Sequence, residues 1–314
     1  MNNNLNNIND KTKIKSNNNK KRKKIILVSL ILLMLLIFLI LFIFFINNNK
    51  ETITNDNNQV ENNKPLTELE KKLLELENIN EKLDFFKEEY IDRYIDYKNN
   101  NPNLDLEKVI VYVNIGLDQE FYSKSYPSPN QNTSKILTNK FYSLTEDYVP
   151  NDLETIDSNF SSGSKEMVKE AKDAFEKMAK DAKSEGYNIR AVSTYRSYEY
   201  QEKLYSNYVK ADGVEKADTY SARAGSSEHQ TGLAVDVDNI TLSYTSFGKT
   251  KEYEWMQKNA YKYGFILRYT KEAEFITGYQ EEPWHYRYVG TEISTYIQNN
   301  PMTYEEYFVR FLDK

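Results

Sequence analysis

The sequence predicts an α+β fold: a small antiparallel sheet with flanking helices, preceded by a transmembrane helix and a helical stalk. One observation behind this prediction is a mixed order of helix-like and strand-like segments after residue 104, without an internal repeat. The other is an uncharged apolar run near the N-terminus. The length of 314 residues fits about two domains, or one domain with appendages.

Residues 25–46 predict the transmembrane helix. They contain no charged residue and one weakly polar residue, Ser29. At about 1.5 Å per residue, a helix of this length crosses a hydrocarbon layer of about 30 Å. The rival interpretation is a cleaved signal peptide, whose apolar part spans about 7–15 residues and ends in small residues. Because this run is longer and ends in Phe44-Phe45-Ile46, we expect an uncleaved anchor.

The charge distribution predicts the orientation of this anchor. Residues 1–24 carry eight Lys or Arg against one acid, a formal charge of +7. Because the whole chain has a net charge of −6, residues 25–314 carry −13. Positive segments stay in the cytoplasm, which places a disordered N-terminal tail inside and residues 47–314 outside the cell membrane. So acidic an outer segment argues against a nucleic-acid partner. The absence of cysteine excludes disulfides, thiolate metal sites and cysteine nucleophiles.

Residues 47–103 form the predicted connection between the anchor and the outer domain. Residues 47–64 are polar and predict a spacer, whereas apolar residues between 66 and 97 recur at helical spacing. Two interpretations remain open for this helix: a stalk or coiled coil, or an amphipathic helix that packs on the outer domain. The run Asn99-Asn100-Asn101-Pro102 ends it, and the outer domain follows at 104–314.

Within 104–314, helices and strands alternate irregularly. Apolar residues from Val168 to Ala182 lie on one face of an expected helix, with Ser164 as its N-cap and Gly186 at its end. Two further helices are expected near 198–208 and 251–263. Thr303 and Glu306 form a capping-box pattern that opens a final helix. The expected strands are 109–113, 188–193, 233–237, 265–269 and 284–289.

The chain has only two histidines, His229 and His285. Each lies within a few residues of an acidic residue, Asp236 for His229 and Glu282 for His285. In the strand 233–237, alternation directs Asp236 away from the apolar face. Two histidines and one carboxylate form a ligand set typical of catalytic zinc, with a fourth position open for water. Glu282, three residues before His285, is well placed to act as a general base.

Several separated motifs add a family resemblance. The pattern Ser227-x-His229-x-x-Gly232-x-Ala234-x-Asp236, followed by Glu282-x-Trp284-His285, resembles the zinc D,D-carboxypeptidases of the VanY type. The segments 193–201, 263–269 and 276–279 also resemble that family. The resemblance covers about residues 104–314 and is best from Ser164 onward.

The resemblance implies a role for each candidate residue. His229, Asp236 and His285 are expected to ligate Zn²⁺, and Glu282 to be the catalytic base. Arg196 is expected to stabilise the oxyanion, although a structural salt bridge is the alternative. Ser227 and Gln201 are expected to hold the terminal carboxylate of the substrate, although Ser227 also suits a turn or cap.

The function that follows is a membrane-anchored zinc D,D-carboxypeptidase that hydrolyses the terminal D-alanine from peptidoglycan stem peptides or their precursors. An L,D-carboxypeptidase or a peptidoglycan endopeptidase with the same zinc site is an alternative. A non-catalytic cell-wall-binding protein is the alternative from another class. The oligomeric state stays open.

Overall fold

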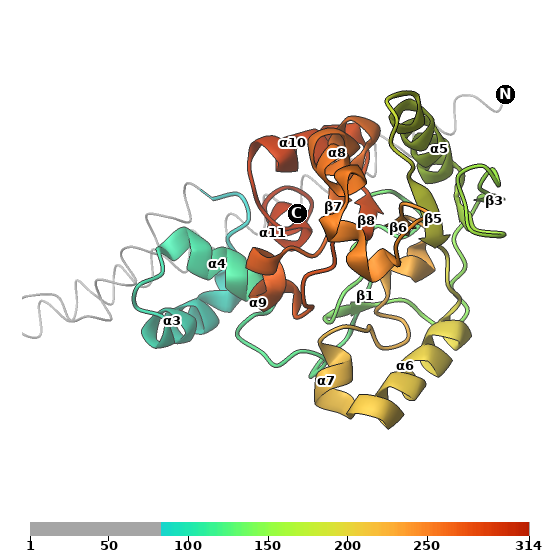
Figure 1. Cartoon of the computed structure of the whole chain (residues 1–314). Coiled ribbons are helices and arrows are strands. Elements are labelled where there is room, and N and C mark those ends of the chain that lie inside the picture. Colours follow the sequence, from blue (N-terminus) through green and yellow to red (C-terminus); the bar gives the residue numbers. More distant parts are fainter. Residues whose placement is uncertain (1–82, 314) are drawn as a thin grey trace, which may run out of the picture. The chain divides into compact units, whose positions relative to one another are not determined.

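The computed structural model describes residues 83–313, which belong to one compact unit (Figure 1). At its centre is a four-stranded sheet in the order β5-β6-β8-β7, and every neighbouring pair is antiparallel. Its strands are β5 (Arg190–Ser193), β6 (Ala234–Asp238), β7 (Phe265–Leu267) and β8 (His285–Tyr288). The predicted antiparallel sheet is therefore confirmed.

One face of the sheet is apolar because alternate residues of β6 and β8 point toward it. Val235, Val237, Tyr286 and Tyr288 join a core cluster with side chains of α5 (Lys169–Ser184) and α8 (Lys251–Asn259). Phe175 of α5 belongs to this cluster and is fully buried. The opposite face of the strands is thus left for polar side chains.

The helix α5 begins later than the sequence predicts. The chain first forms β4 (Glu166–Val168), which pairs antiparallel with β3 (Leu153–Thr155), and the N-cap of α5 is Val168. Ser164 lies before β4, so its assignment as the N-cap is wrong. The pairing of β4 uses the residues that a helix starting at Ser164 would have placed in its first turn.

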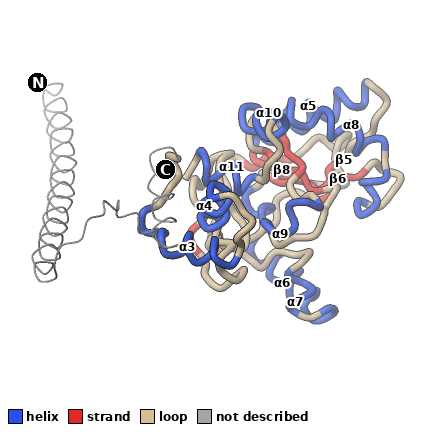
Figure 2. The backbone as a smooth tube through the Cα atoms, turned by 90° about the vertical axis from the view of Figure 1, so that its left-hand side faces the viewer, coloured by secondary structure: helices blue, strands red, loops and turns tan. Residues whose placement is uncertain are grey.

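Helices α6 (Tyr198–Asp212) and α7 (Val214–Asp218) lie on the opposite side of the sheet from α5 and α8 (Figures 1 and 2). The hydroxyl of Ser197 caps α6 by accepting a hydrogen bond from the Tyr200 N–H at 3.2 Å. Gly213, with φ of +81°, separates the two helices. Helix α6 and the loop that follows α7 supply one wall of the site described below.

A second core cluster joins the segments before and after the sheet. It contains residues of α4 (Leu106–Ile115), α10 (Thr291–Asn299) and α11 (Tyr304–Phe311). The strand expected at 109–113 is wrong, because these residues belong to α4, which starts at the N-cap Asp105 and ends at Gly116. Seven consecutive residues of α4 are buried, so the sequence shows a continuous apolar run in place of a helical period.

The described part of the expected stalk packs on this second cluster. Helix α3 (Ile91–Asn100) contacts α4, and Tyr94 is fully buried, with its hydroxyl 2.7 Å from Asn114 Oδ1. Lys87 also forms an ion pair with Asp313 at 2.7 Å. Residues 83–100 therefore pack on the outer domain, which is the second of the two interpretations left open for this segment.

The remaining short elements complete the unit. The capping box predicted at Thr303 and Glu306 is confirmed at the start of α11. Strands β1 (Tyr126–Pro127) and β2 (Tyr142–Ser143) pair in parallel, and α9 (Glu274–Thr277) is a single turn. The 3-10 helices are η1 (Glu88–Tyr90), η2 (Glu228–Thr231), η3 (Tyr244–Lys249), η4 (Ala260–Tyr263) and η5 (Lys271–Ala273).

The predicted tail 1–24, anchor 25–46 and spacer 47–64 lie outside the described residues. Among residues 83–313, none of the helices has both the length and the apolar character needed to span a bilayer.

Candidate metal centre and active site

The first part of the site is a tight turn that leads into β6. The Ser227 hydroxyl accepts a hydrogen bond from the His229 N–H at 3.4 Å and caps the 3-10 helix η2. Gly232 ends η2 with φ of +69°, and a Cβ there would lie 3.0 Å from Leu153 Cδ2. This turn places His229 beside β6, whose alternation directs Asp236 to the same region, as the sequence predicts.

The second part comes from β8. In the antiparallel register, Asp236 of β6 lies directly opposite His285 of β8. Both side chains are on the face away from the core cluster of Val235 and Tyr286, and the distance from Asp236 Oδ1 to His285 Nδ1 is 3.1 Å. The pairing of the two strands therefore brings together residues that are 49 positions apart in the chain.

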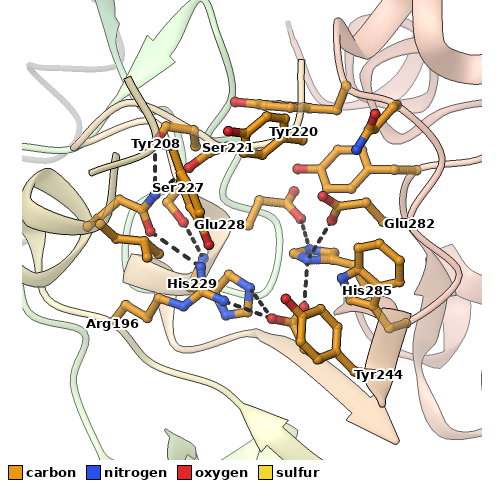
Figure 3. Close-up of a pocket in the computed structure, with 18 of the residues that line it drawn as sticks. Arg196, Tyr208, Tyr220, Ser221, Ser227, Glu228, His229, Tyr244, Glu282 and His285 are labelled. Carbon is orange, nitrogen blue, oxygen red and sulfur yellow. Dashed lines mark hydrogen bonds and ion pairs between the residues drawn. The ribbon is translucent and has the colours of Figure 1, made fainter. Parts of the chain in front are cut away.

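Each imidazole directs one nitrogen toward Asp236, and its other nitrogen contacts a different residue. His229 Nε2 lies 3.3 Å from Asp236 Oδ2, while its Nδ1 bonds the Thr194 carbonyl at 2.7 Å. His285 Nδ1 faces Asp236, while its Nε2 lies 3.3 Å from Glu228 Oε2 (Figure 3). The nitrogens free to ligate a metal are thus His229 Nε2 and His285 Nδ1.

These three residues fit a zinc ion. Their donor atoms lie within 4.8 Å of one another, and all three side chains are buried. Burial and the charge of Arg196 lower the pKa of His229 to about 4, so its imidazole is neutral and able to ligate. Burial opposes ionisation of Asp236, but His229, His285 and Arg196 hold its pKa well below the usual range. Two histidines and a carboxylate leave a position open, as catalytic zinc sites require.

Glu282 borders the donor set. Its Oε2 lies 3.6 Å from His285 Nδ1, and the side chain is nearly buried. Backbone hydrogen bonds from the Glu282 N–H to the Tyr269 carbonyl and from the His285 N–H to the Glu282 carbonyl fix the turn at Pro283. Burial raises the pKa of Glu282 to about 7, which is the range of a group that both accepts and donates a proton near neutrality.

Arg196 reaches the site from the segment between β5 and α6. Its Nη2 lies 2.8 Å from Asp236 Oδ2, its Nε donates to Ser193 Oγ at 2.9 Å, and its Nη1 to Gln201 Oε1 at 3.4 Å. The guanidinium therefore forms the salt bridge that was the alternative expectation, and Arg196 also lines the pocket.

Gln201 and Ser227 are both buried in the pocket wall. The Gln201 amide nitrogen donates to the Ala222 carbonyl at 2.8 Å and to Ser221 Oγ at 3.4 Å. Its hydrogen bonds thus hold Arg196 and the 221–222 loop. The Ser227 oxygen caps η2 by accepting a hydrogen bond, which leaves its own proton for another acceptor.

Sequence reasoning missed Glu228, which lies between Ser227 and His229 and has a fully buried side chain. Burial opposes its ionisation, but the charges of Arg268 and Arg287 outweigh burial and hold its pKa below the usual range. Its position directly before a candidate metal ligand was the available signal. Tyr269, whose ring lies tilted against the His285 ring with centroids 4.8 Å apart, was also missed.

The site residues line one pocket with a volume of about 540 Å³ (Figure 3). The pocket contains all seven residues singled out in the sequence, together with aromatic side chains from α6, η3 and the loops that follow α7, β7 and α9. These aromatic residues are Tyr208, Tyr220, Tyr244, Tyr269, Tyr279 and Trp284. The pocket therefore joins a metal-binding set, a carboxyl group of raised pKa and a guanidinium.

Comparison with known proteins agrees with this geometry. Residues 164–291 match a family model described as VanY, D-alanyl-D-alanine carboxypeptidase. The Bacillus subtilis (strain 168) protein YodJ is 46% identical over 187 residues, covering 57% of this chain and 68% of that protein. A D-alanyl-D-alanine carboxypeptidase of Enterococcus faecalis is 37% identical over 135 residues, covering 40% of this chain and 49% of that protein.

A solved structure of the LdcB LD-carboxypeptidase is also similar. It matches with a TM-score of 0.52 and 47% identity, over 55% of this chain and 85% of that chain.

Proposed function

Because the chain belongs to the VanY family of carboxypeptidases, which act on peptidoglycan-related peptides, we propose that it releases C-terminal D-alanine from peptidoglycan stem peptides. The observation that carries the proposal is the position of Glu282 beside the donor set of His229, Asp236 and His285 in one pocket. The three-ligand set provides an open metal position, and Glu282 adds the general base that hydrolysis requires.

His229 Nε2, a carboxylate oxygen of Asp236 and His285 Nδ1 would hold the zinc ion. Bound zinc supplies a Lewis acid that activates water and polarises the carbonyl group of the scissile bond. The protein keeps these three ligands in place through the Asp236–His285 strand register and the hydrogen bond from His229 Nδ1 to the Thr194 carbonyl.

Glu282 accepts a proton from the attacking water and returns it to the departing amine of D-alanine. Both transfers require a carboxyl group whose pKa lies near the working pH, and burial raises the pKa of Glu282 to about 7. The buried position also keeps bulk water away from the proton.

Arg196 stabilises negative charge that develops on the carbonyl oxygen, because a guanidinium presents fixed donors in a water-poor pocket. Ser193, Gln201 and Asp236 hold three of its nitrogens and fix its orientation. The Ser227 hydroxyl, which retains its proton for donation, holds the terminal carboxylate of the peptide. Gln201 contributes to binding of this carboxylate indirectly, because its hydrogen bonds hold Arg196 and the 221–222 loop in place.

We propose the specificity from the relatives. The identity of 47% to an LD-carboxypeptidase exceeds the 37% to an Enterococcus faecalis D-alanyl-D-alanine carboxypeptidase, which favours L,D activity on a tetrapeptide stem. The D,D activity expected from the sequence, on a pentapeptide stem, is the second candidate and is favoured by the description of the matching family model.

Mass spectrometry of both stem peptides after incubation with the zinc-loaded protein separates these candidates. Loss of one alanine from the tetrapeptide supports the L,D assignment, and loss from the pentapeptide alone supports the D,D assignment. Intact peptides in the presence of bound zinc would overturn the proposal in favour of an endopeptidase or a wall-binding protein.

We further propose that residues 25–46 anchor the protein in the cell membrane, with residues 1–24 in the cytoplasm and the peptidase domain outside. The length of the apolar run and the basic residues before it support this proposal. The full chain should sediment with membranes and lose its peptidase domain to protease added outside intact protoplasts. Recovery of the full chain in the soluble fraction would contradict the anchor.

A further inference from the structure

A buried series of ion pairs runs from His285 to the C-terminal helix α11. It starts at Glu228, whose Oε2 lies 3.3 Å from His285 Nε2. Because Glu228 accepts the hydrogen on Nε2, the ring keeps its Nδ1 directed toward Asp236 and the metal position. Figure 3 shows Glu228 and Glu282 both approaching the His285 ring.

Two arginines fix Glu228 from its other side. Arg268 Nε lies 2.8 Å from Glu228 Oε1, and Arg287 Nη1 lies 3.1 Å from the same oxygen. All three side chains have at most 1% of their surface exposed. A buried carboxylate held by two guanidinium groups has little freedom to move, so its oxygen is a fixed acceptor for His285.

The series continues to Glu305 of α11. Arg268 forms a two-pronged ion pair with Glu305, with Nη1–Oε2 and Nη2–Oε1 distances of 2.9 and 2.6 Å. Asn139 also donates to Glu305 Oε1 at 3.1 Å. Glu305 and Asn139 both lie outside residues 164–291, the part that matches the family model.

We propose that Glu228 is a positioning residue for the metal ligand His285, and that Glu305, acting through Arg268, holds Glu228 in place. Helix α11 is then part of the support of the metal centre, although it lies at the far end of the chain and contributes no ligand. The proposal rests on the zinc site and is independent of which stem peptide is cleaved.

Zinc affinity tests this inference without reference to catalysis. Purified E228Q and E305Q proteins are titrated with zinc in competition with a chromogenic chelator. The matched control is D238N, which breaks the ion pair of Arg190 with Asp238 on β6, with distances of 3.0 and 2.8 Å. None of the hydrogen bonds or ion pairs given for Asp238 within residues 83–313 reaches a metal ligand.

Loss of an outer partner of a ligating histidine weakens metal binding by about 10- to 100-fold. We therefore expect this loss in E228Q, a smaller loss in E305Q, and wild-type affinity in D238N. In the zinc-loaded wild-type protein, ¹⁵N NMR should place the ring proton of His285 on Nε2.

Wild-type zinc affinity in E228Q and E305Q would overturn the inference, and so would an equal loss in D238N. Should E228Q fail to fold, E305Q carries the test, since it keeps Glu228 and changes a side chain that is separated from His285 by Arg268 and Glu228. Failure of the zinc-loaded wild-type protein to cleave either stem peptide would instead count against the proposed function and leave this inference standing.

Discussion

Arg196 Nη2 lies 2.8 Å from Asp236 Oδ2, so the arginine expected to stabilise the oxyanion is paired with an expected zinc ligand. The pairing orients the guanidinium beside the metal position, and its charge contributes to the low pKa of Asp236. In the proposed mechanism, metal binding and transition-state stabilisation share one carboxylate, and a substitution at Arg196 has to be examined for both effects.

Replacement of Arg196 by lysine should lower kcat by about 10²- to 10³-fold, the typical effect of losing one oxyanion donor. A lysine keeps the charge but cannot bond Ser193, Gln201 and Asp236 together. Zinc content by metal analysis should stay at the wild-type level. Arg190→Lys, at the ion pair with Asp238, is the control and should keep its kcat. A fall in zinc content that parallels the loss of kcat would show that Arg196 acts only through its ligand partner.

Lys140 gives a prediction for stability against pH. Its ammonium is buried against the Tyr279 ring at 4.2 Å and donates to the carbonyls of Asp218 and Gly278, both at 2.7 Å. Burial lowers the pKa of Lys140 from 10.5 to about 8. Between pH 8 and 10.5 the unfolded chain therefore binds this proton more tightly than the folded chain, and stability from this group rises with pH.

The free energy of unfolding of the wild type, relative to Lys140→Met, should increase by up to about 1.4 kcal/mol per pH unit in this window. Urea unfolding of both proteins at several pH values measures the difference and cancels groups that they share. Parallel stability curves from pH 8 to 10.5 would contradict the assigned shift.

Tyr94→Phe tests whether α3 is part of the compact unit. The Tyr94 hydroxyl donates to the buried Asn114 side chain and accepts from the half-buried Lys87 N–H at 3.1 Å, and its loss leaves the Asn114 oxygen without this donor. We expect a loss of about 1–3 kcal/mol in the free energy of unfolding. Tyr126→Phe, on a ring that is 47% exposed, is the control and should change little. Equal stability of both variants would favour the independent stalk for this helix.

The sequence was most informative where a local pattern decided the structure. Alternation in 233–237 and 284–289 identified the face of Asp236 and the strand of His285, and the Thr303 capping box identified the start of α11. Sequence reasoning failed at Val109–Val113, because a helix that is buried on all sides shows no alternation of apolar and polar residues at helical spacing. It also could not identify Glu305 as a partner of Arg268, since that contact depends on packing between segments 37 residues apart.

Gln201 illustrates another limit of sequence reasoning. A motif indicates which residues surround a site, but the direction of an amide depends on its partners. Here the Gln201 side chain is engaged by Arg196, Ser221 and Ala222.

Turnover and zinc content of Glu282→Gln test the central claim most directly. If Glu282 is the base beside a zinc site formed by His229, Asp236 and His285, the variant keeps its zinc. D-alanine release should then fall by about 10²- to 10⁴-fold, the range for loss of a general acid–base group. Release of D-alanine at close to the wild-type rate would contradict the account.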